Sequence, residues 1–368
     1  MNARQIPRLF CLLLAGSMAD SNAQGPPPIP PSYPDHSKLL ILRDLEGNER
    51  PITQIADWEV RRAQILTHFQ RVAGTLPGGE RRVALDVRVE GETTDAPLFV
   101  RKKISFATEP GSRVSAWLLL PKNKEGDLPS PAMLCLHQTT RIGKDEPAGL
   151  GGLPNLRYAQ ELAEHGYVAL APDYPNFGES KLDVYAMGYA SATMKGIWNH
   201  LRAVDVLASL PEVDGGRIGV IGHSLGGHNA IFVALFDPRI KAVVSSCGFN
   251  AFPRYYRGNI TGWSHSGYMP RLRSVFGLDL KQVPFDFPEL LGALAPRAVF
   301  VSAPLHDENF DVEGVKTCLE AAKPVYKLHG ASDRLTAYFP ASGHDFPVEA
   351  RKGAFAFLDE VFKHQSKR

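Results

Sequence analysis

The chain has 368 residues, of which 44% are hydrophobic and 22% are charged, and its formal net charge is +2. This composition is close to that of an ordinary globular protein with a sizeable core. The balanced charge and the lack of a dense run of lysine and arginine argue against nucleic acid or an anionic membrane as a partner.

The N-terminus has the pattern of a secretory signal peptide. Arg4 and Arg8 form a positive region, residues 9–15 form a short apolar stretch, and small residues up to Ala23 suit cleavage there. We therefore expect residues 1–23 to be a signal peptide and the mature protein to be secreted or periplasmic, with an irregular cytosolic N-terminus as the alternative. The apolar stretch is too short to serve as a membrane anchor.

Three cysteines would remain after this cleavage, and an odd number cannot form a complete disulfide framework. Cys135 and Cys247 lie in apolar, strand-like runs and are expected to be buried thiols. A single bridge that includes Cys318 or joins the other two stays open as an alternative.

Residues 24–80 are expected to form an extension made of a linker and a helix. The proline-rich residues 25–34 indicate an extended linker. Residues 55–72 carry apolar side chains at near-helical spacing, and we expect an amphipathic helix that ends before Gly74 and packs on the outside of the main domain.

Residues 81–368 are predicted to form the main domain. Strands are predicted at residues 83–89, 99–108 and 114–120. After them, short apolar strands alternate with helices: strands at 132–136, 167–171, 218–221, 240–245, 298–302 and 335–339, and helices at 156–164, 192–210, 226–235, 312–322 and 348–362. This alternation predicts an α/β domain with a mostly parallel central sheet and helices on both faces.

One segment, residues 249–296, separates two of these strands by more than a usual connection. It is rich in aromatic residues, namely Phe252, Tyr255, Tyr256, Trp263 and Tyr268. We expect most of them to pack the segment onto the core, and the segment as a whole to be a cap-like insertion over a substrate site.

The strongest chemical signal is Gly-His-Ser-Leu-Gly at residues 222–226, between a predicted strand and a predicted helix. A serine on such a turn has a strained backbone and an exposed hydroxyl, and the flanking glycines avoid collisions with the neighbouring strand and helix. Ser224 is therefore the predicted nucleophile.

A serine hydroxyl needs a base to accept its proton and an acid to orient that base. His344 follows the last predicted strand and is the expected base, whereas His329 precedes that strand. Asp307 follows the preceding strand and is the expected acid. Asp311 is its rival, and Glu308 is a weaker candidate.

Hydrolysis through a tetrahedral intermediate also requires two hydrogen-bond donors for the oxyanion. The backbone N–H of Leu225, directly after the serine, is expected to be one of them. The other should come from the loop after the strand at 132–136, where Gln138 is the preferred donor and Thr139 the alternative.

No cofactor is expected. His265 and His306 lack the grouping that a metal site requires, and the glycines at residues 149–152 lack the strand and helix of a dinucleotide-binding turn. His223 and His228 flank the serine, and packing is favoured over substrate contact for both.

Residues from about 113 to 362 resemble the α/β-hydrolase superfamily. The resemblance rests on Leu136-His137, Ala171-Pro172-Asp173, residues 222–226, Asp307 and Ser342-Gly343-His344. Within the superfamily the chain is similar to the dienelactone-hydrolase-like and acetyl xylan esterase-like branch. Residues 294–297 also resemble glucuronoyl esterases, but no arginine follows the serine, and a serine stands where true dienelactone hydrolases have cysteine.

The resemblance implies a serine carboxylesterase with an α/β-hydrolase fold, an acyl-enzyme intermediate and no metal or cofactor. Its expected partner is a small-molecule or polysaccharide ester, such as an acetyl, feruloyl or methyl uronate ester of plant polysaccharide. A serine peptidase of the prolyl-oligopeptidase type is the first alternative, although no N-terminal propeller is present. An inactive binding module is the second, and the retained serine, aspartate and histidine oppose it.

Overall fold

The computed structural model of the protein describes residues 29–93, 96–122 and 129–365. The expected signal peptide, residues 1–23, lies outside these residues, and so does the first part of the proline-rich stretch. Each helix in the described ranges is too short or too polar to cross a membrane.

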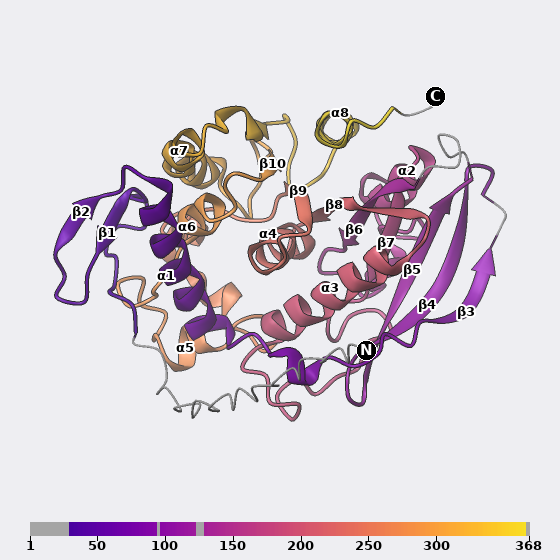
Figure 1. Ribbon diagram of the computed structural model, residues 1–368, viewed down its shortest axis with the longest axis horizontal. Coiled ribbons are helices and arrows are strands. Elements are labelled where there is room, and N and C mark those ends of the chain that lie inside the picture. The colour runs from indigo at the N-terminus through magenta and orange to yellow at the C-terminus, as the bar shows by residue number, and fades with distance from the viewer. Residues whose placement is uncertain (1–28, 94–95, 123–128, 366–368) are drawn as a thin grey trace, which may run out of the picture.

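A nine-stranded sheet runs through the described part of the chain in the order β11-β10-β9-β8-β6-β7-β5-β4-β3 (Figure 1). Its parallel strands are β6 (Ser130–Leu136), β7 (Val168–Pro172), β8 (Val213–His223), β9 (Ile240–Ser246), β10 (Ala298–Ser302) and β11 (Leu335–Tyr338). The antiparallel strands β3 (Arg88–Thr93), β4 (Phe99–Glu109) and β5 (Ser112–Pro121) extend it beyond β7. The mostly parallel sheet predicted from the sequence is therefore confirmed.

The prediction of a strand at residues 83–89 is wrong in position, because β3 begins at Arg88. Asp86 has a φ of 42°, which interrupts an extended run, and its main-chain oxygen accepts a hydrogen bond from Arg113 of β5. β3 is also exposed along its whole length, so burial does not constrain its register.

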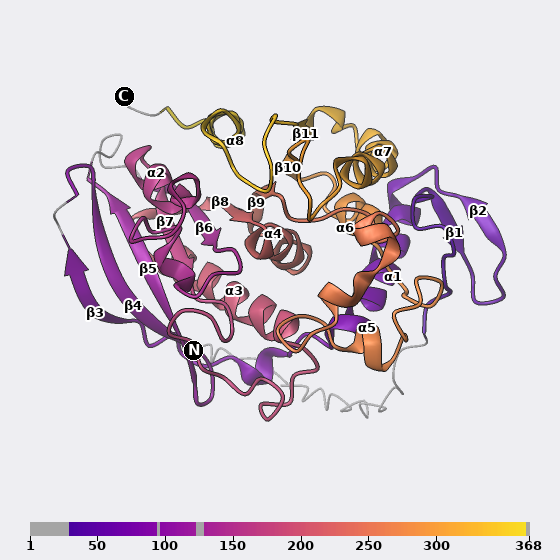
Figure 2. The same ribbon diagram turned by 180° about the vertical axis from the view of Figure 1, so that it is seen from behind.

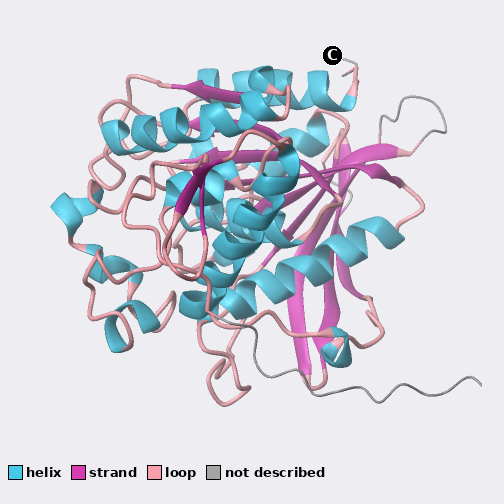
Figure 3. Ribbon diagram, turned by 60° about the vertical axis from the view of Figure 1, so that its left-hand side comes forward, coloured by secondary structure: helices cyan, strands magenta, loops and turns pink. Residues whose placement is uncertain are grey.

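Helices cover both faces of the sheet (Figures 2 and 3). Because successive side chains of a strand point to opposite sides, each central strand contributes residues to the packing on both faces. Met133 and Cys135 of β6 belong to the same buried cluster as residues of α2 (Tyr158–Glu164) and α8 (Val348–Phe362). Leu134 and Leu136 belong to the cluster on the other face, with α3 (Ala192–Ser209), α4 (Leu225–Phe236) and α7 (Val312–Leu328).

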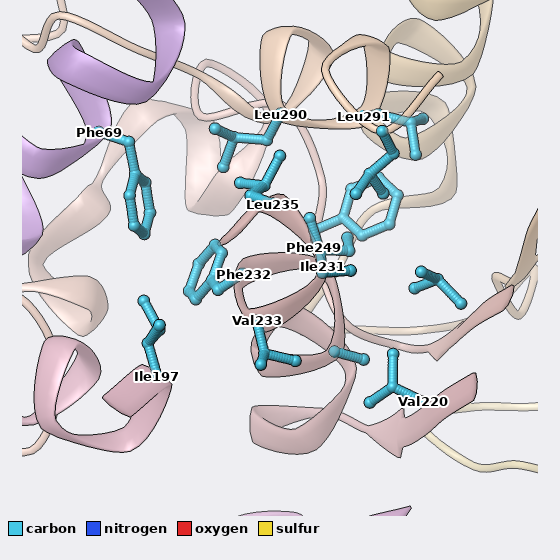
Figure 4. Packing of buried hydrophobic residues seen from close by; sticks show 14 of the residues in the cluster. Phe69, Ile197, Val220, Ile231, Phe232, Val233, Leu235, Phe249, Leu290 and Leu291 are labelled. Atoms are coloured by element: carbon cyan, nitrogen blue, oxygen red, sulfur yellow. The ribbon is translucent and has the colours of Figure 1, made fainter. Parts of the chain in front are cut away.

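Helix α4, which follows Ser224 directly, lies inside the core. All of its residues from Leu225 to Leu235 are buried. Figure 4 shows Phe232 of this helix facing Phe69 of α1 (Ile55–Ala73), and the two ring centroids are 4.9 Å apart. A helix enclosed in this way holds its N-terminus in a fixed position relative to the sheet.

The N-terminal extension contains the predicted helix as α1. Trp58, Ile65 and Phe69 are fully buried in it, and the helix stops at Gly74, whose φ is 104°. A two-stranded hairpin of β1 (Ile41–Arg43) and β2 (Glu49–Pro51) precedes it, which the sequence did not predict. Strands of three residues carry too little pattern to be recognised.

A buried ionic cluster fastens this extension to the insertion at residues 249–296. Glu289 of α6 (Phe287–Gly292) binds Arg61 of α1, and its carboxylate lies 2.8 Å from Nδ1 of His36. Burial tends to lower the pKa of His36, but the Glu289 carboxylate raises it above its usual value overall. The extension and the insertion thus support each other.

The insertion itself consists of short helical turns, including α5 (Arg271–Ser274) and α6, wrapped around aromatic side chains. Phe252, Tyr255 and Trp263 are at most 8% exposed, whereas Tyr256 is 56% exposed. Packing onto the core is therefore confirmed for most of the aromatic residues.

The three cysteines at positions 135, 247 and 318 are all free and buried. The prediction of buried thiols is confirmed, and no bridge joins them.

Candidate active site

The structure places Ser224 on a sharp turn between β8 and α4. Its backbone has φ 52° and ψ −115°, a combination that L-residues rarely adopt, and its N–H donates to the carbonyl of Ser246 in β9 at 2.8 Å. Leu225 is the first residue of α4, so its N–H has no acceptor within the helix. The turn has the geometry predicted for it.

Glycines make this turn possible. A Cβ on Gly222 would lie 2.2 Å from the carbonyl oxygen of Gly226, and a Cβ on Gly226 would lie 1.8 Å from the carbonyl oxygen of Leu136 in β6. Both contacts are with backbone atoms, which cannot rotate away as a side chain can. The helix after Ser224 therefore approaches β6 more closely than any other residue type allows.

We expect the Gly226→Ala substitution to destabilise the protein by about 3 kcal/mol, at the upper end of typical overpacking costs. Gly215→Ala in β8 is the matched control, because a Cβ there meets nothing within 4 Å. Denaturant unfolding of both variants beside the wild type measures the difference. Equal stabilities of the two variants would contradict the close approach of α4 to β6.

The structure joins the predicted acid to the predicted base. Nδ1 of His344 lies 2.9 and 3.0 Å from the two carboxylate oxygens of Asp307. Oδ1 of Asp307 also accepts from the N–H groups of Asn309 and Phe310, at 2.8 and 3.0 Å. Burial tends to raise the pKa of Asp307, but the bond to His344 and these N–H groups hold that pKa below its usual value. A charged carboxylate therefore orients the ring.

The rival acids lie elsewhere. Asp311 caps the N-terminus of α7, where its side chain accepts from the N–H of Glu313 at 3.0 Å. Glu308 is exposed to solvent, and no contact to His344 is found for it within the described ranges. The geometry thus selects Asp307 as the partner of His344.

His344 lies beside the serine turn but does not bond to it. Its ring centroid is 4.9 Å from that of His223, the residue before Ser224. Among the described residues, no hydrogen bond joins the hydroxyl of Ser224 to His344. Such bonds are often long in unliganded enzymes and shorten when substrate binds.

The loop after β6 lies next to Ser224, since Leu136 of β6 pairs with Gly222 of β8. His137 shapes this loop. Burial lowers the pKa of His137, so its ring is neutral; Nε2 accepts from the N–H of Tyr174 at 3.0 Å, and Nδ1 donates to the carbonyl of Gln138 at 2.6 Å.

This bond turns the carbonyl of Gln138 toward His137, so the N–H of Thr139, in the same planar peptide, points the opposite way. In the described part of the chain, the N–H groups of Gln138 and Thr139 donate no hydrogen bond. Both predicted sources of the second oxyanion donor therefore remain open. The hydroxyl of Thr139 lies 3.0 Å from that of Tyr268 in the insertion.

Two buried polar atoms without partners lie between α4 and the insertion. His228, one helical turn after Ser224, is neutral because burial lowers its pKa to about 3; its Nδ1 donates to the carbonyl of Gly248 at 3.2 Å. Its Nε2 is thus an acceptor and has no partner, and the indole N–H of Trp263 has none either. The two ring centroids are 4.7 Å apart.

Such atoms normally find partners when they are buried, so both are unsatisfied groups in the packed interface between α4 and the insertion. The sequence favours packing as the role of His228 and of most aromatic residues of the insertion, and the ring contact between His228 and Trp263 agrees with this prediction. The spacing of His228 four residues after Ser224 predicts that the two lie near each other, because residues four apart share one face of a helix. The pairing with Trp263 had no signal in the sequence.

A third group completes the surroundings of the acid. Donor atoms of Cys247, Asp307 and His344 all lie within 4.8 Å of one another. Burial raises the pKa of Cys247 well above its usual value, so it stays a thiol, and it donates to the carbonyl of Asp345 at 3.3 Å. A protonated thiol is a poor metal ligand, and the histidine nitrogen already binds the carboxylate. The donor set favours an acid–base pair over a metal site.

The chain has the α/β-hydrolase fold, and its serine turn and Asp307–His344 pair are arranged as in serine esterases of that fold. It is an ester-hydrolysing enzyme. A family profile described as "Glucuronyl esterase, fungi" matches residues 178–330.

Among curated proteins, the "Putative hydrolase YtaP" of Bacillus subtilis is 28% identical over 67% of this chain and 83% of its own length. A "4-O-methyl-glucuronoyl methylesterase" of Phanerochaete carnosa is 22% identical over 90% of this chain and 82% of its own length. Among solved structures, "Glucuronoyl Esterase from Solibacter usitatus" has a TM-score of 0.71 and 20% identity, and the match covers 90% of this chain and 99% of that one. This last likeness is one of fold.

Proposed function

We propose that the protein is a secreted serine carboxylesterase that hydrolyses esters of uronic acids. The observation that carries the catalytic part is the buried Asp307–His344 pair beside the strained Ser224 turn. An oriented histidine beside the serine turn is the arrangement that acyl transfer requires.

In the proposed reaction, Ser224 Oγ attacks the ester carbonyl carbon while Nε2 of His344 takes the hydroxyl proton. The N–H of Leu225 and that of Gln138 or Thr139 bind the oxyanion of the tetrahedral intermediate. His344 then gives its proton to the leaving alcohol, and the carbonyl–oxygen bond to that alcohol breaks. Water attacks the acyl-serine by the same route and releases the carboxylic acid and free Ser224.

The uronate part of the proposal rests on the similarity to the Phanerochaete methylesterase, and we infer that the neighbouring His228 and Trp263 side chains contact a sugar hydroxyl when substrate binds. A simple acetyl ester has no hydroxyl group for this pair. The two kinds of ester should therefore respond differently when the pair is altered.

A comparison of methyl glucuronate with p-nitrophenyl acetate tests this proposal. We expect wild type to hydrolyse both, and Trp263→Phe to lower kcat/KM for the uronate ester about three- to tenfold, the value of one hydrogen bond. The same variant should leave kcat/KM for p-nitrophenyl acetate within about twofold, because no sugar hydroxyl is involved.

Trp58→Phe is the matched control, since the indole N–H of Trp58 is also buried without a partner but lies in α1. It should leave the ratio of the two activities unchanged. Hydrolysis of p-nitrophenyl acetate without hydrolysis of the uronate ester would contradict the substrate class, and cleavage of peptide amides without ester hydrolysis would contradict the esterase assignment.

A further inference from the structure

A pocket lined mainly by polar residues lies beside the loop after β6. It has a volume of about 470 Å³, and Thr139, Arg141, Asn176, Phe177, Ser180 and Lys181 are among the residues that line it. This size is in the range of small-ligand sites, roughly 300–1,000 Å³. Thr139 connects it to the candidate active site, because its N–H is one of the two possible oxyanion donors and its hydroxyl contacts Tyr268.

Two positively charged side chains in this pocket have no ion-pair partner among the described residues. Arg141 and Lys181 are exposed, and neither side chain forms an ion pair or hydrogen bond with any described residue. Most other cations around this loop are paired: Lys144 binds Asp173 at 3.1 Å, and Lys103 binds Glu179 at 2.6 Å. The two free cations therefore face the pocket without local compensation.

Neither cation forms an ion pair with the acidic residues nearby, within the described part of the chain. Glu179 binds Lys103 and accepts from the hydroxyl of Ser115 at 3.0 Å. Asp183 accepts from the N–H groups of Tyr185 and Ala186, at 3.1 and 3.0 Å. A pocket with two unpaired cations and neutral polar groups is suited to bind an anion. In a uronate substrate, that anion is a free carboxylate.

We propose that this pocket binds a free carboxylate of the substrate, so that the enzyme prefers a uronate ester with an unesterified uronate next to it in an oligosaccharide. This inference rests on the proposed function for the identity of the ester. Arg141 lies two residues after Thr139 in the loop that carries the proposed oxyanion donors, so the pocket adjoins the place proposed for the ester carbonyl. Arg141 and Lys181 are then specificity determinants outside the reacting centre.

The test compares two substrates, a methyl uronate monosaccharide and a diuronate with one methyl ester and one free carboxylate. We expect wild type to prefer the diuronate at low ionic strength. In the Arg141→Gln/Lys181→Gln variant, kcat/KM for the diuronate should fall about three- to tenfold through KM, as expected for two exposed charge pairs. The monosaccharide ester should change by less than about twofold.

Lys327→Gln/Lys352→Gln is the matched control, since it removes two exposed charges of α7 and α8 that form no ion pair with any described residue. It should leave both activities near wild type. An equal loss on the two esters in Arg141→Gln/Lys181→Gln, or no loss on the diuronate, would overturn the inference.

Calorimetric binding of the fully de-esterified diuronate to Ser224→Ala separates this inference from the proposed function. If neither ester is hydrolysed but Ser224→Ala binds the diuronate and loses binding when Arg141 and Lys181 are also replaced, the anion site stands and the esterase proposal fails. If both esters are hydrolysed and the added replacements leave binding unchanged, the esterase proposal stands and the anion site fails.

Discussion

The Ser224→Ala variant is expected to lose about a millionfold in kcat on any ester that the wild type hydrolyses, the typical cost of removing a catalytic serine. The physical reason is that no other group in the site forms the acyl-enzyme, so only attack by water remains. Folding should be preserved, because alanine keeps the Cβ of serine and the hydroxyl of Ser224 forms no hydrogen bond within the described structure. Initial rates and a thermal unfolding curve measure the two effects.

Ser245→Ala is a useful control for this experiment. Ser245 is buried in β9, and its hydroxyl donates to the carbonyl of Gly227 at 3.0 Å, so it supports α4 without facing the reaction. We expect a modest loss of stability, about 1 kcal/mol, with kcat close to wild type. A Ser224→Ala enzyme with kcat near wild type would refute the assignment of the nucleophile.

Asp307→Asn is the second variant with a large expected effect, a loss of about ten-thousandfold in kcat. The amide can donate to Nδ1 of His344, which leaves the proton on Nε2, the atom that must accept the proton of Ser224. The amide also lacks the negative charge that stabilises the imidazolium. Steady-state kinetics at saturating substrate would show this loss in kcat, with KM little changed.

Asp311→Asn provides the comparison, since Asp311 is four residues away and caps α7. Asparagine is also a good N-cap, so stability and kcat should both stay near wild type. If Asp311→Asn were the more damaging of the two, His344 would have a different partner in the active enzyme.

Much of the fold could be predicted because the strands are buried and the helices are long. Strands such as β6 are almost entirely apolar, as a strand covered on both faces must be, and most helices around them begin and end within two residues of their predicted positions. The exception is α7, which continues through Pro324 to Leu328, six residues beyond its predicted end. The errors lie where burial is weak. The hairpin before α1 is too short to carry a pattern, and β3 is exposed and displaced by the turn at Asp86.

Some residues of the candidate site could be predicted from the sequence, and others could not. Ser224, His344 and Asp307 each follow a predicted strand, and parallel strands bring their ends to one edge of the sheet, so chain order was enough to find them. The choice between Gln138 and Thr139 depends on the direction of one peptide plane, which His137 controls through a hydrogen bond to the carbonyl of Gln138.

Groups from separate loops could not be paired from the sequence. The rings of His228 and Trp263 are neighbours only because the insertion folds back over α4, and Arg141 and Lys181 line one pocket only because the segments after β6 and β7 both border it. A sequence shows which side chains are chemically capable, but contacts between distant loops follow from the whole fold.

Labelling with a fluorophosphonate, followed by peptide mapping, is the most direct test of the central claim that Ser224 is an activated nucleophile. The account predicts one adduct per chain on Ser224, a rate of labelling that falls steeply in Asp307→Asn, and no adduct in Ser224→Ala. An adduct on another residue, or a wild-type chain that stays unlabelled while it hydrolyses esters, would contradict the account.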